Sequence, residues 1–545
     1  MTRSGILKVV GLALAVVLAV VAYRLLGTIV GAKVEQRLAK VGLTQNELAA
    51  GGPLAGSVDL YGKEFACAQQ LRTPGYYQSI NSAEIADAER SGVFPCATFL
   101  GSHEGANRVL AWRSADEYDG VSYINNGKPG ELYLVGGEFP TAADPLPIGP
   151  WVAKADATTG KQIWRTYVDN LNASGRWIGN ANLNLLDNGK IVFAWSNQIV
   201  LIDPATGAIL KHNTLPTGDA PAADVNFKHV TVAPDRTLMV KDQTRPTGCT
   251  LQGTMAILQC ADKGLPWSSS VLLAVNPDTL EVIDQIKLPQ STPTPHAITT
   301  FEGKIYIYVG MLDVARRYLW DPSTKKLSAD ETWSIHPMQK GQSAADAPTI
   351  VGDWVGFQLN GTGSETVASS VVIASQRDAK ITKTIFPFGE LKKGEWSFAP
   401  PKAGADVENN MIYSADMGMR KVAGIKLDQA TGEMKVAFVV DDVTNTFQPV
   451  IGPKDKRVLL LTNMKQNVEK EPIKVAMFTE NYKEQLTWRD AATGKIIAES
   501  DFFEPLTINS LTTPGFGGRI YFPTSVGKGF YVLQALPKPA TVASK

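Results

Sequence analysis

Histidine, cysteine and charged residues are scarce in this chain, and each shortage excludes a class of function. Of 545 residues, 5 are histidine and 4 are cysteine, and only 19% are charged. No two histidines lie two or four residues apart, so no local pair is spaced to bind a metal. A Cys-x-x-Cys-His run for covalent haem is absent, and so are Gly-x-Ser-x-Gly and a phosphate-binding Gly-Lys-Ser/Thr loop.

An excess of one charge sign is missing as well. Lys and Arg total 53, and Asp and Glu also total 53. A chain without net charge creates no field that attracts a polyanion. We therefore expect no nucleic-acid partner.

A recurring turn phrase is what the chain does contain. Residues 156–164 read DATTGKQIW, and shorter copies begin at residues 203, 428 and 490. An aspartate that opens a tight turn accepts backbone N–H bonds, and a glycine supplies positive φ. We therefore interpret the phrase as a turn between strands. Its residues are Asp156, Thr159, Gly160, Trp164, Asp203, Thr206, Gly207, Asp428, Thr431, Gly432, Asp490, Thr493 and Gly494.

Three weaker copies complete the pattern. With them, the turns begin at residues 156, 203, 276, 321, 378, 428 and 490. A base period of about 45–50 residues is typical of four-stranded propeller blades, with insertions between the longer-spaced copies. The sequence therefore predicts an all-β propeller of four-stranded antiparallel blades, eight of them or alternatively seven. The final strands, 519–522 and 529–533, are expected to close the ring with 109–112 or 131–135.

The phrase resembles the tryptophan-docking repeat of the quinoprotein-like propellers, which runs Ala-x-Asp-x-x-Thr-Gly-Lys-x-x-Trp. Asp156, Thr159, Gly160, Lys161 and Trp164 fit this pattern, and Lys154 stands at its alanine position. The other copies keep the aspartate, threonine and glycine but lose the tryptophan. The resemblance covers roughly residues 106–536 and implies the fold rather than an activity, because this superfamily contains both dehydrogenases and scaffolds.

The resemblance also implies what a catalytic member would hold. Such a member carries a pyrroloquinoline quinone (PQQ) cofactor on the propeller axis, with a calcium ion bound by carboxylate and amide oxygens and an aspartate as general base. The large alcohol-oxidising members also have adjacent cysteines, and no two cysteines are adjacent here. We therefore expect no cofactor, metal or catalytic residue. A PQQ and calcium dehydrogenase, or another enzyme with an axial site, is the alternative.

The N-terminus predicts a membrane anchor over residues 1–31. Residues 5–23 form an apolar run of 19 residues, enough to cross about 30 Å of hydrocarbon. Arg3 precedes this run and Lys8 lies near its start, which predicts a cytoplasmic N-terminus and a propeller in the periplasm or outside the cell. A cleaved signal peptide is the alternative.

The remaining chain divides into three parts. Residues 32–105 carry no repeat, and we interpret them as a stalk or cap with helices at 33–49 and 82–91. Residues 106–536 form the propeller, and 537–545 form a flexible tail. Disulfides are expected in an extracytoplasmic chain, and Cys249 and Cys260 flank an insertion. The expected pairs are Cys67–Cys96 and Cys249–Cys260, although other connectivities stay open.

Few residues invite a chemical interpretation. Each histidine is expected to be structural, with only His296 placed to face the axis; the others are His103, His212, His229 and His336. The glycine-rich stretch 361–365 is interpreted as a loop. Two insertions unlike the blade pattern, 249–260 and 465–474, are the candidate contact segments. The predicted function is a non-catalytic scaffold or accessory subunit that contacts membrane or envelope proteins.

Overall fold

The described part of the chain is built almost entirely of β-strands. The structure is a computed structural model, and it describes residues 57–71, 74–118, 120–137, 150–168, 182–250, 260, 263–344, 347–444, 446–479, 481–505, 511–524 and 529–538. All of them belong to one of two units, Ser57–Lys545. The anchor predicted at 1–31, the helix predicted at 33–49 and residues 539–545 of the predicted tail lie outside the described residues.

The first four sheets are four-stranded and antiparallel, and we number them blades 1 to 4. Blade 1 contains β3 (Val121–Asn126), β4 (Glu131–Gly136), β5 (Trp151–Asp156) and β6 (Gln162–Tyr167), and blade 2 contains β7 (Leu183–Leu185), β8 (Ile191–Trp195), β9 (Gln198–Ile202) and β10 (Ile209–Thr214). Blade 3 contains β11 (Val225–Val232), β12 (Leu238–Thr244), β13 (Val271–Val275) and β14 (Val282–Lys287), preceded by η1 (Ala222–Asp224). Blade 4 contains β15 (His296–Phe301), β16 (Lys304–Gly310), β17 (Ala315–Asp321) and β18 (Lys326–Ile335).

Four further sheets follow. Blade 5 contains β19 (Thr349–Val351), β20 (Trp354–Gln358), β21 (Val371–Ser375) and β22 (Thr382–Ile385), and blade 6 contains β23 (Gly404–Asp406), η2 (Val407–Asn409), β24 (Met411–Asp416), β25 (Lys421–Leu427) and β26 (Met434–Asp441). Blade 7 contains β27 (Val450–Ile451), η3 (Lys454–Lys456), β28 (Val458–Gln466), α5 (Ile473–Thr479), β29 (Tyr482–Asp490) and β30 (Ile496–Glu499). Blade 8 contains β31 (Thr513–Pro514), η4 (Phe516–Gly518), β32 (Arg519–Pro523), β33 (Phe530–Pro537) and the earlier strand β2 (Asn107–Arg113).

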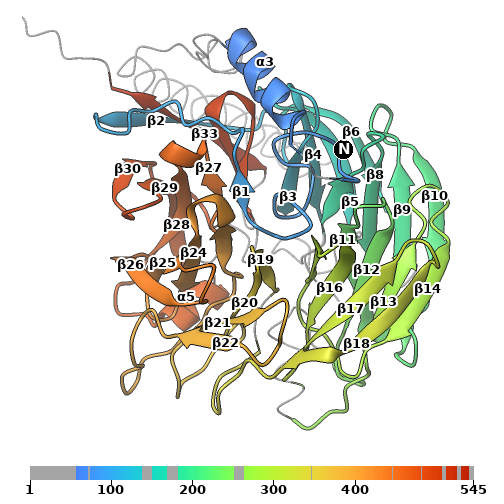
Figure 1. Cartoon of the computed structure of the whole chain (residues 1–545). Helices are drawn as coiled ribbons and strands as arrows, with labels where there is room; N and C mark the ends of the chain where they lie inside the picture. Colours follow the sequence, from blue (N-terminus) through green and yellow to red (C-terminus); the bar gives the residue numbers. More distant parts are fainter. Residues whose placement is uncertain are drawn as a thin grey trace, which may run out of the picture. The chain divides into compact units, whose positions relative to one another are not determined.

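Blade 8 closes the ring, as Figure 1 shows. The first strand of the propeller, β2, pairs antiparallel with the last strand, β33, with Leu110 opposite Gln534. The innermost strand β31 contacts β3 of blade 1. The prediction of an all-β propeller is confirmed, with eight blades rather than seven, and of the two closing strands considered, 109–112 is correct.

The apolar core lies between neighbouring sheets. Val192 and Leu201 of blade 2, for example, pack with Phe227 and Leu238 of blade 3, and all four side chains are buried. A strand that is covered by a neighbouring blade on each side buries both of its faces. This double burial explains the continuous apolar runs in the sequence.

The antiparallel order gives the ring two different faces. Turns from the first to the second strand and from the third to the fourth strand emerge on one side, which we call the turn face. Connections from the second to the third strand and from one blade to the next emerge on the other side, the loop face. All seven predicted turns lie on the turn face, and insertions 249–260 and 465–474 lie in connections of the loop face.

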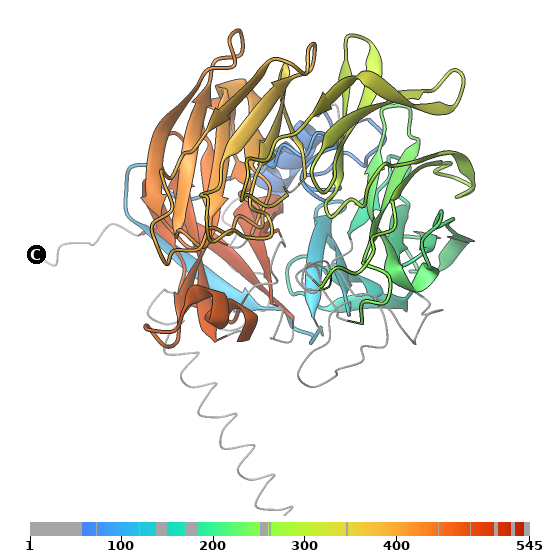
Figure 2. The same cartoon turned by 90° about the horizontal axis from the view of Figure 1, so that it is seen from below.

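A segment before the propeller follows the inner strands around the axis. We call residues 74–97 the axial segment, and in Figure 2 this blue part of the chain lies at the centre of the ring. Its carbonyl groups accept inner-strand N–H bonds from blades 1, 2, 4, 5, 6 and 7: Asn81 from Asn126 (2.7 Å), Ser82 from Leu185 (2.9 Å), Ala88 from Ile298 (2.8 Å), Glu89 from Ile350 (3.1 Å), Ser91 from Ala405 (2.8 Å) and Gly92 from Val450 (2.8 Å). Tyr76 contacts blade 3 by accepting a hydrogen bond from Val232 N at 2.8 Å.

The end of the axial segment joins blade 7, and a helix covers blade 8. Strand β1 (Val93–Phe94) pairs parallel with β27, which makes this sheet five-stranded. Helix α3 (Ser57–Ala68) contacts η4, where Glu64 accepts a hydrogen bond from Gly517 N at 2.6 Å. A disulfide between Cys67 and Cys96 ties α3 to the axial segment. The described part of 57–105 is therefore integrated into the propeller.

The helix predicted at 82–91 is wrong. These residues form turns and bends, and Ala86 and Arg90 have φ of 63° and 61°. Carbonyl groups that a helix would use internally are hydrogen-bonded to the inner strands. Ser82 in an N-cap position and Glu84 near the first turn suggested the helix, but backbone groups of this segment are satisfied by the strands around it.

Both expected disulfides are present: Cys67 with Cys96, and Cys249 with Cys260. Among the residues that the structure describes, no helix is both long enough and apolar enough to span a membrane.

Candidate functional site

The predicted turn residues lie in the turns between third and fourth strands. In blade 1, Asp156 Oδ1 accepts hydrogen bonds from Thr158 N at 3.0 Å and from Thr159 N at 2.7 Å. Gly160 closes the turn with φ of +69°. The copies repeat this geometry, with Asp203, Asp428 and Asp490 each accepting the N–H of the threonine three residues on, namely Thr206, Thr431 and Thr493.

The same turns receive an aromatic ring from the preceding blade. Trp164 of β6 donates from Nε1 to Pro204 O at 3.2 Å. A Cβ atom at Gly207 would lie 2.6 Å from the Trp164 ring, so only glycine allows this approach. This packing explains the glycine of the phrase, and it makes Trp164 a contact between two blades.

Other aromatic residues also pack on the turn of the following blade, and these contacts were not predicted from the sequence. Trp112 of β2 donates to Thr158 O at 3.1 Å on the turn of blade 1, and Trp354 of β20 donates to Gln429 O at 3.0 Å on the turn of blade 6. A Cβ atom at Gly494 would lie 2.6 Å from Phe438 of β26. The number of residues between the aromatic ring and the turn that it contacts differs from case to case. A search for a fixed phrase could therefore not detect these contacts.

The aspartates of these turns show no sign of catalytic tuning. The Thr206 N–H and the Ala205 N–H hold the pKa of Asp203 below its ordinary value. Asp203 is half-buried and Asp428 is exposed. A carboxylate with a lowered pKa that accepts backbone N–H bonds in this way serves turn geometry.

The axis holds a buried polar cluster beside the axial segment. It contains Arg90, His229, Lys241, Asp242 and His296, all of which are buried. Lys241 Nζ donates to Asp242 O at 2.7 Å and also to the Thr292 hydroxyl. Burial lowers the pKa of Lys241 to about 7 and raises the pKa of Asp242 to about 7. Burial also lowers the pKa of His229 and of His296 well below the ordinary value, so both rings are neutral at pH 7.

The remaining histidines lie away from this cluster. His212 pairs with Gln198 on the surface of blade 2, His336 Nδ1 lies 3.1 Å from Asp313 O, and the His103 ring lies 5.2 Å from the Phe99 ring. His296 does lie beside the axis, as the sequence indicated, and His229 of the neighbouring blade joins it there.

The polar cluster does not fit a calcium-dependent quinone. Calcium requires six to eight oxygen ligands, usually with several carboxylates. Among the described residues, no group of three or more His, Cys, Asp or Glu side chains is placed to hold a metal ion. The cluster is mostly basic. It therefore does not supply the oxygen ligands that the calcium ion of such a cofactor requires.

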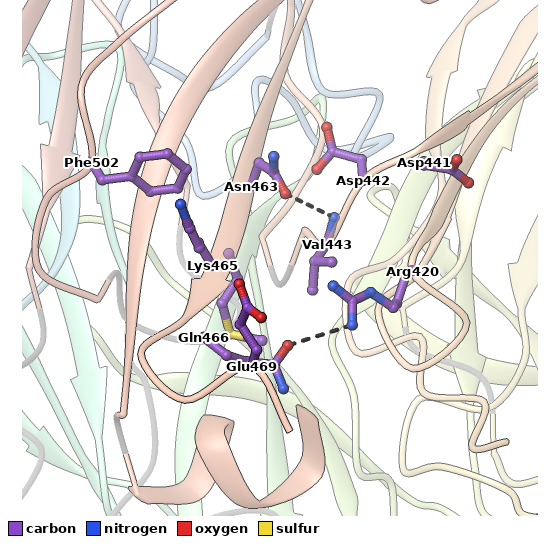
Figure 3. Close-up of a pocket in the computed structure, with 10 residues that line it drawn as sticks. Arg420, Asp441, Asp442, Val443, Asn463, Lys465, Gln466, Glu469 and Phe502 are labelled. Atoms are coloured by element: carbon purple, nitrogen blue, oxygen red, sulfur yellow. Dashed lines mark hydrogen bonds between the residues drawn. The ribbon is translucent and has the colours of Figure 1, made fainter. Parts of the chain in front are cut away.

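The loop face carries a pocket between blades 6 and 7. Its volume is about 480 Å³, within the range of small-ligand and side-chain sites. Figure 3 shows side chains from the β24–β25 turn, β26, β28 and the segments that follow β28 and β30. The lining residues are Arg420, Asp441, Asp442, Val443, Asn463, Met464, Lys465, Gln466, Glu469 and Phe502.

One wall of the pocket belongs to an excursion of blade 7. We call residues 465–481 the β28–β29 excursion; it includes α5 and the whole predicted contact insertion 465–474. Ile473 and Met477 of α5 are buried in a small apolar cluster with Met464, Met417 and Phe398. Lys474 also forms an ion pair with Glu365 of blade 5, with 3.2 Å between Nζ and Oε1. Glu365 belongs to the stretch 361–365, which forms a loop as predicted. The excursion is therefore anchored on blades 5 and 6.

A buried carboxylate forms the back of the pocket. Asp442 is 3% exposed, and its Oδ2 accepts a hydrogen bond from Arg489 Nη2 at 2.7 Å. Burial raises the pKa of Asp442 to about 7, although the Arg489 guanidinium opposes this shift. Asp441, Glu469, Arg420 and Lys465 are exposed at the rim. The other predicted contact insertion, 249–260, lies almost wholly outside the described residues.

The described strands and their docking turns form an eight-bladed β-propeller. Solved structures share this fold, among them three that each cover 88–91% of this chain. A quinohemoprotein alcohol dehydrogenase from Comamonas testosteroni has a TM-score of 0.53 and 11% identity over 90% of this chain and 86% of its own. The quinohemoprotein alcohol dehydrogenase ADHIIG from Pseudomonas putida HK5 has a TM-score of 0.50 and 10% identity over 91% of this chain and 85% of its own.

A europium-containing methanol dehydrogenase has a TM-score of 0.51 and 10% identity over 88% of this chain and 100% of its own. At such identities the likeness shows the fold alone. No family model matches the sequence, and no curated protein matches it either.

Proposed function

We propose that this chain is a membrane-anchored, extracytoplasmic β-propeller that acts as a non-catalytic scaffold or accessory subunit of a membrane or envelope protein complex. The observation that carries the proposal is the β28–β29 excursion. Its inner side is fixed by a separate apolar cluster on blades 6 and 7. A rigid element that projects from a regular frame offers a preformed contact surface.

The outer side of this region has the composition of a contact surface. Val468 is 53% exposed, Val475 is 43% exposed and Phe502 is 37% exposed. Charged side chains stand between them, including Lys465, Glu469 and Lys474. Exposed apolar groups within a polar rim are typical of protein interfaces.

The location outside the cytoplasm rests on two features of the chain. The basic N-terminus and the apolar run at 5–23 support a single-pass anchor with the propeller on the outer side. Disulfides persist mainly in oxidising compartments, and all four cysteines are paired here. The proposed partners are therefore other membrane or envelope proteins.

The second candidate function is a PQQ and calcium dehydrogenase with a site on the axis. It is favoured by a fold shared with alcohol dehydrogenases, and it is disfavoured by the mostly basic axial cluster. It is also disfavoured because, among the described residues, no group of three or more His, Cys, Asp or Glu side chains is placed to hold a metal ion.

Copurification from mild detergent separates the two candidates. A tagged full-length chain should bring down a membrane protein in fixed proportion, and a variant with residues 467–481 replaced by a short Gly-Ser turn should not. Replacing the exposed turn-face residues Lys325 and Lys326 by alanine is the matched control. The same sample, given PQQ, calcium and an alcohol, should not reduce an artificial electron acceptor. A chain that purifies alone and reduces the acceptor would establish the enzyme instead.

A further inference from the structure

The pocket between blades 6 and 7 contains a buried hydrogen-bond acceptor that the described protein does not satisfy. Asp442 Oδ2 is bonded to Arg489, but Asp442 Oδ1 accepts no hydrogen bond from a described residue. The neighbouring Val443 N–H lies close enough to the carboxylate to lower its pKa, but its hydrogen bond goes to Asn463 Oδ1 at 3.3 Å. A buried acceptor without a donor is unfavourable, so an occupant that donates a hydrogen bond at this point would be stabilised.

The position of Asp442 is fixed from several elements. Its own N–H donates to Arg420 O at 3.0 Å, and Arg489 of β29 holds its Oδ2. Arg489 also donates to Gly494 O at 2.9 Å, which ties it to the turn of blade 7. The carboxylate is therefore a preorganised acceptor, which favours binding because little ordering is left to the occupant.

The cations at the rim already have partners. Arg420 Nη1 lies 3.4 Å from Gln466 Oε1, and Figure 3 shows this contact on the side of the pocket away from Phe502. Lys465 Nζ lies 5.6 Å from the centre of the Phe502 ring, in a cation–π contact. Neither cation is bonded to Asp442, whereas Asp441 and Glu469 add negative charge at the mouth.

The walls of the pocket suit an aliphatic stem. Met464 and Val443 line it and are buried, and Phe502 adds an aromatic edge. A lysine or arginine side chain combines an aliphatic stem with a cationic donor at its end. An anionic group would meet Arg420 and Lys465 at the rim, but at the back of the pocket it would lie against the Asp442 carboxylate at close range.

From this arrangement we propose that the pocket receives one arginine or lysine side chain from a segment of the partner protein. The inference rests on the proposed scaffold function and names the chemistry of its partner. The segment carries one basic side chain among neutral or acidic neighbours, because Arg420 and Lys465 at the rim repel a run of basic residues.

Binding should strengthen as the pH rises. Below its pKa of about 7 the Asp442 carboxyl is neutral, and above it the group is ionised. A cationic ligand binds the ionised form more tightly. The charged groups that face Asp442 are Arg489, Arg420 and Lys465, together with Asp441 and Glu469.

Ligand-observed NMR with two capped Gly-Ser peptides tests the proposal on the full-length protein in detergent. One peptide has a central arginine and the other has citrulline, which keeps the shape of arginine without its charge. We expect the arginine peptide to bind at least tenfold more tightly, and more tightly at pH 8 than at pH 6. Asp442→Asn should remove both differences.

The variants keep the test decisive if Asp442→Asn fails to fold. Glu469→Gln and Phe502→Ala change exposed residues and should each weaken binding of the arginine peptide several-fold, while Asp501→Asn, an exposed neighbour outside the pocket, should not. Equal affinity for the two peptides would overturn the proposal. A partner that copurifies equally with wild type and all pocket variants would do so too, and it would leave the scaffold function intact. Peptide binding without any copurifying partner would instead count against the scaffold.

Discussion

The turn face and the loop face are made by the same strands, but they differ in what their connections do. On the turn face, short turns repeat one hydrogen-bond pattern and receive an aromatic ring from the blade before. On the loop face, the described connections differ in length from blade to blade, and the β28–β29 excursion has an apolar cluster of its own. The repeated face holds the frame, and the irregular face provides the individual surface.

The axial segment belongs with the frame. It is hydrogen-bonded to inner strands around the ring, so its removal should loosen many blades at once. Changes there should alter stability, whereas changes at the exposed rim of the pocket should alter binding and leave stability unchanged. The predictions below test this contrast, beginning with the largest effect.

Arg90→Met should destabilise the protein by about 3–5 kcal/mol, because it leaves a buried carboxylate without its partner. Arg90 and Glu84 form an ion pair at 2.7 Å, and the two side chains are 2% and 5% exposed. Denaturant unfolding measures the free energy. Arg236→Met is the matched control, since its ion pair with Asp187 is 36% and 39% exposed and should contribute less than about 1 kcal/mol. Equal losses in the two variants would show that the axial segment is not part of the frame.

Removing the disulfide at the axial segment should destabilise the protein more than removing the disulfide on the loop face. Their sequence separations are 29 residues for Cys67–Cys96 and 11 residues for Cys249–Cys260. Loop entropy then predicts losses of about 3–4 and about 2–3 kcal/mol when both cysteines of a pair become serine. The first pair also fastens α3 to the axial segment. A larger loss from the Cys249–Cys260 pair, measured by denaturant unfolding, would contradict the contrast between the faces.

The position of Glu89 makes the axial segment sensitive to pH. Burial, together with the charge of Asp87, raises the pKa of Glu89 to about 7, above an unfolded value of about 4.3. The contribution of Glu89 to the free energy of unfolding is therefore full below about pH 4, and it is lost as the pH rises through about 7. Glu89→Gln should gain stability relative to wild type, on the order of 2 kcal/mol, between pH 4.5 and pH 8.

Urea unfolding at both pH values measures this gain. The exposed Glu433 on the turn face provides the control, because Glu433→Gln should show the same difference from wild type at both pH values. A Glu89→Gln variant with the same pH dependence as wild type would mean that the carboxyl of Glu89 is ionised in the folded protein throughout this range.

The fold was predictable because the turn phrase has a local physical cause. An aspartate, a threonine and a glycine satisfy their own backbone within five residues, as Asp203, Thr206 and Gly207 show, so the signal survives in a single sequence. Blade 8 lacks the phrase, and its presence was inferred only from leftover strands. The docking rings at Trp112 and Phe438 were missed because their partners lie on another blade.

The site was predictable only in outline. The departure of 465–474 from the blade pattern marked a candidate contact segment, and part of it lines the pocket. Asp442 and Arg489 could not have been paired from the sequence, because they are 47 residues apart and only the packing of neighbouring blades brings them together. The interpretation of 82–91 as a helix failed for the same reason: local pattern cannot reveal that surrounding strands take the backbone hydrogen bonds.

Two adjacent phenylalanines offer the finest test of the contrast between frame and surface. Phe503 is half-buried and packs against the core, with its ring centre 4.4 Å from that of Tyr531, whereas Phe502 is 37% exposed at the pocket rim. Phe503→Ala should cost about 2 kcal/mol, and Phe502→Ala less than about 0.5 kcal/mol, in the free energy of unfolding. Partner copurification should show the reverse order, with Phe502→Ala weakening it and Phe503→Ala leaving it unchanged while the protein stays folded. If instead Phe502→Ala destabilises the protein as much as Phe503→Ala does, this rim supports the frame and is not a free contact surface.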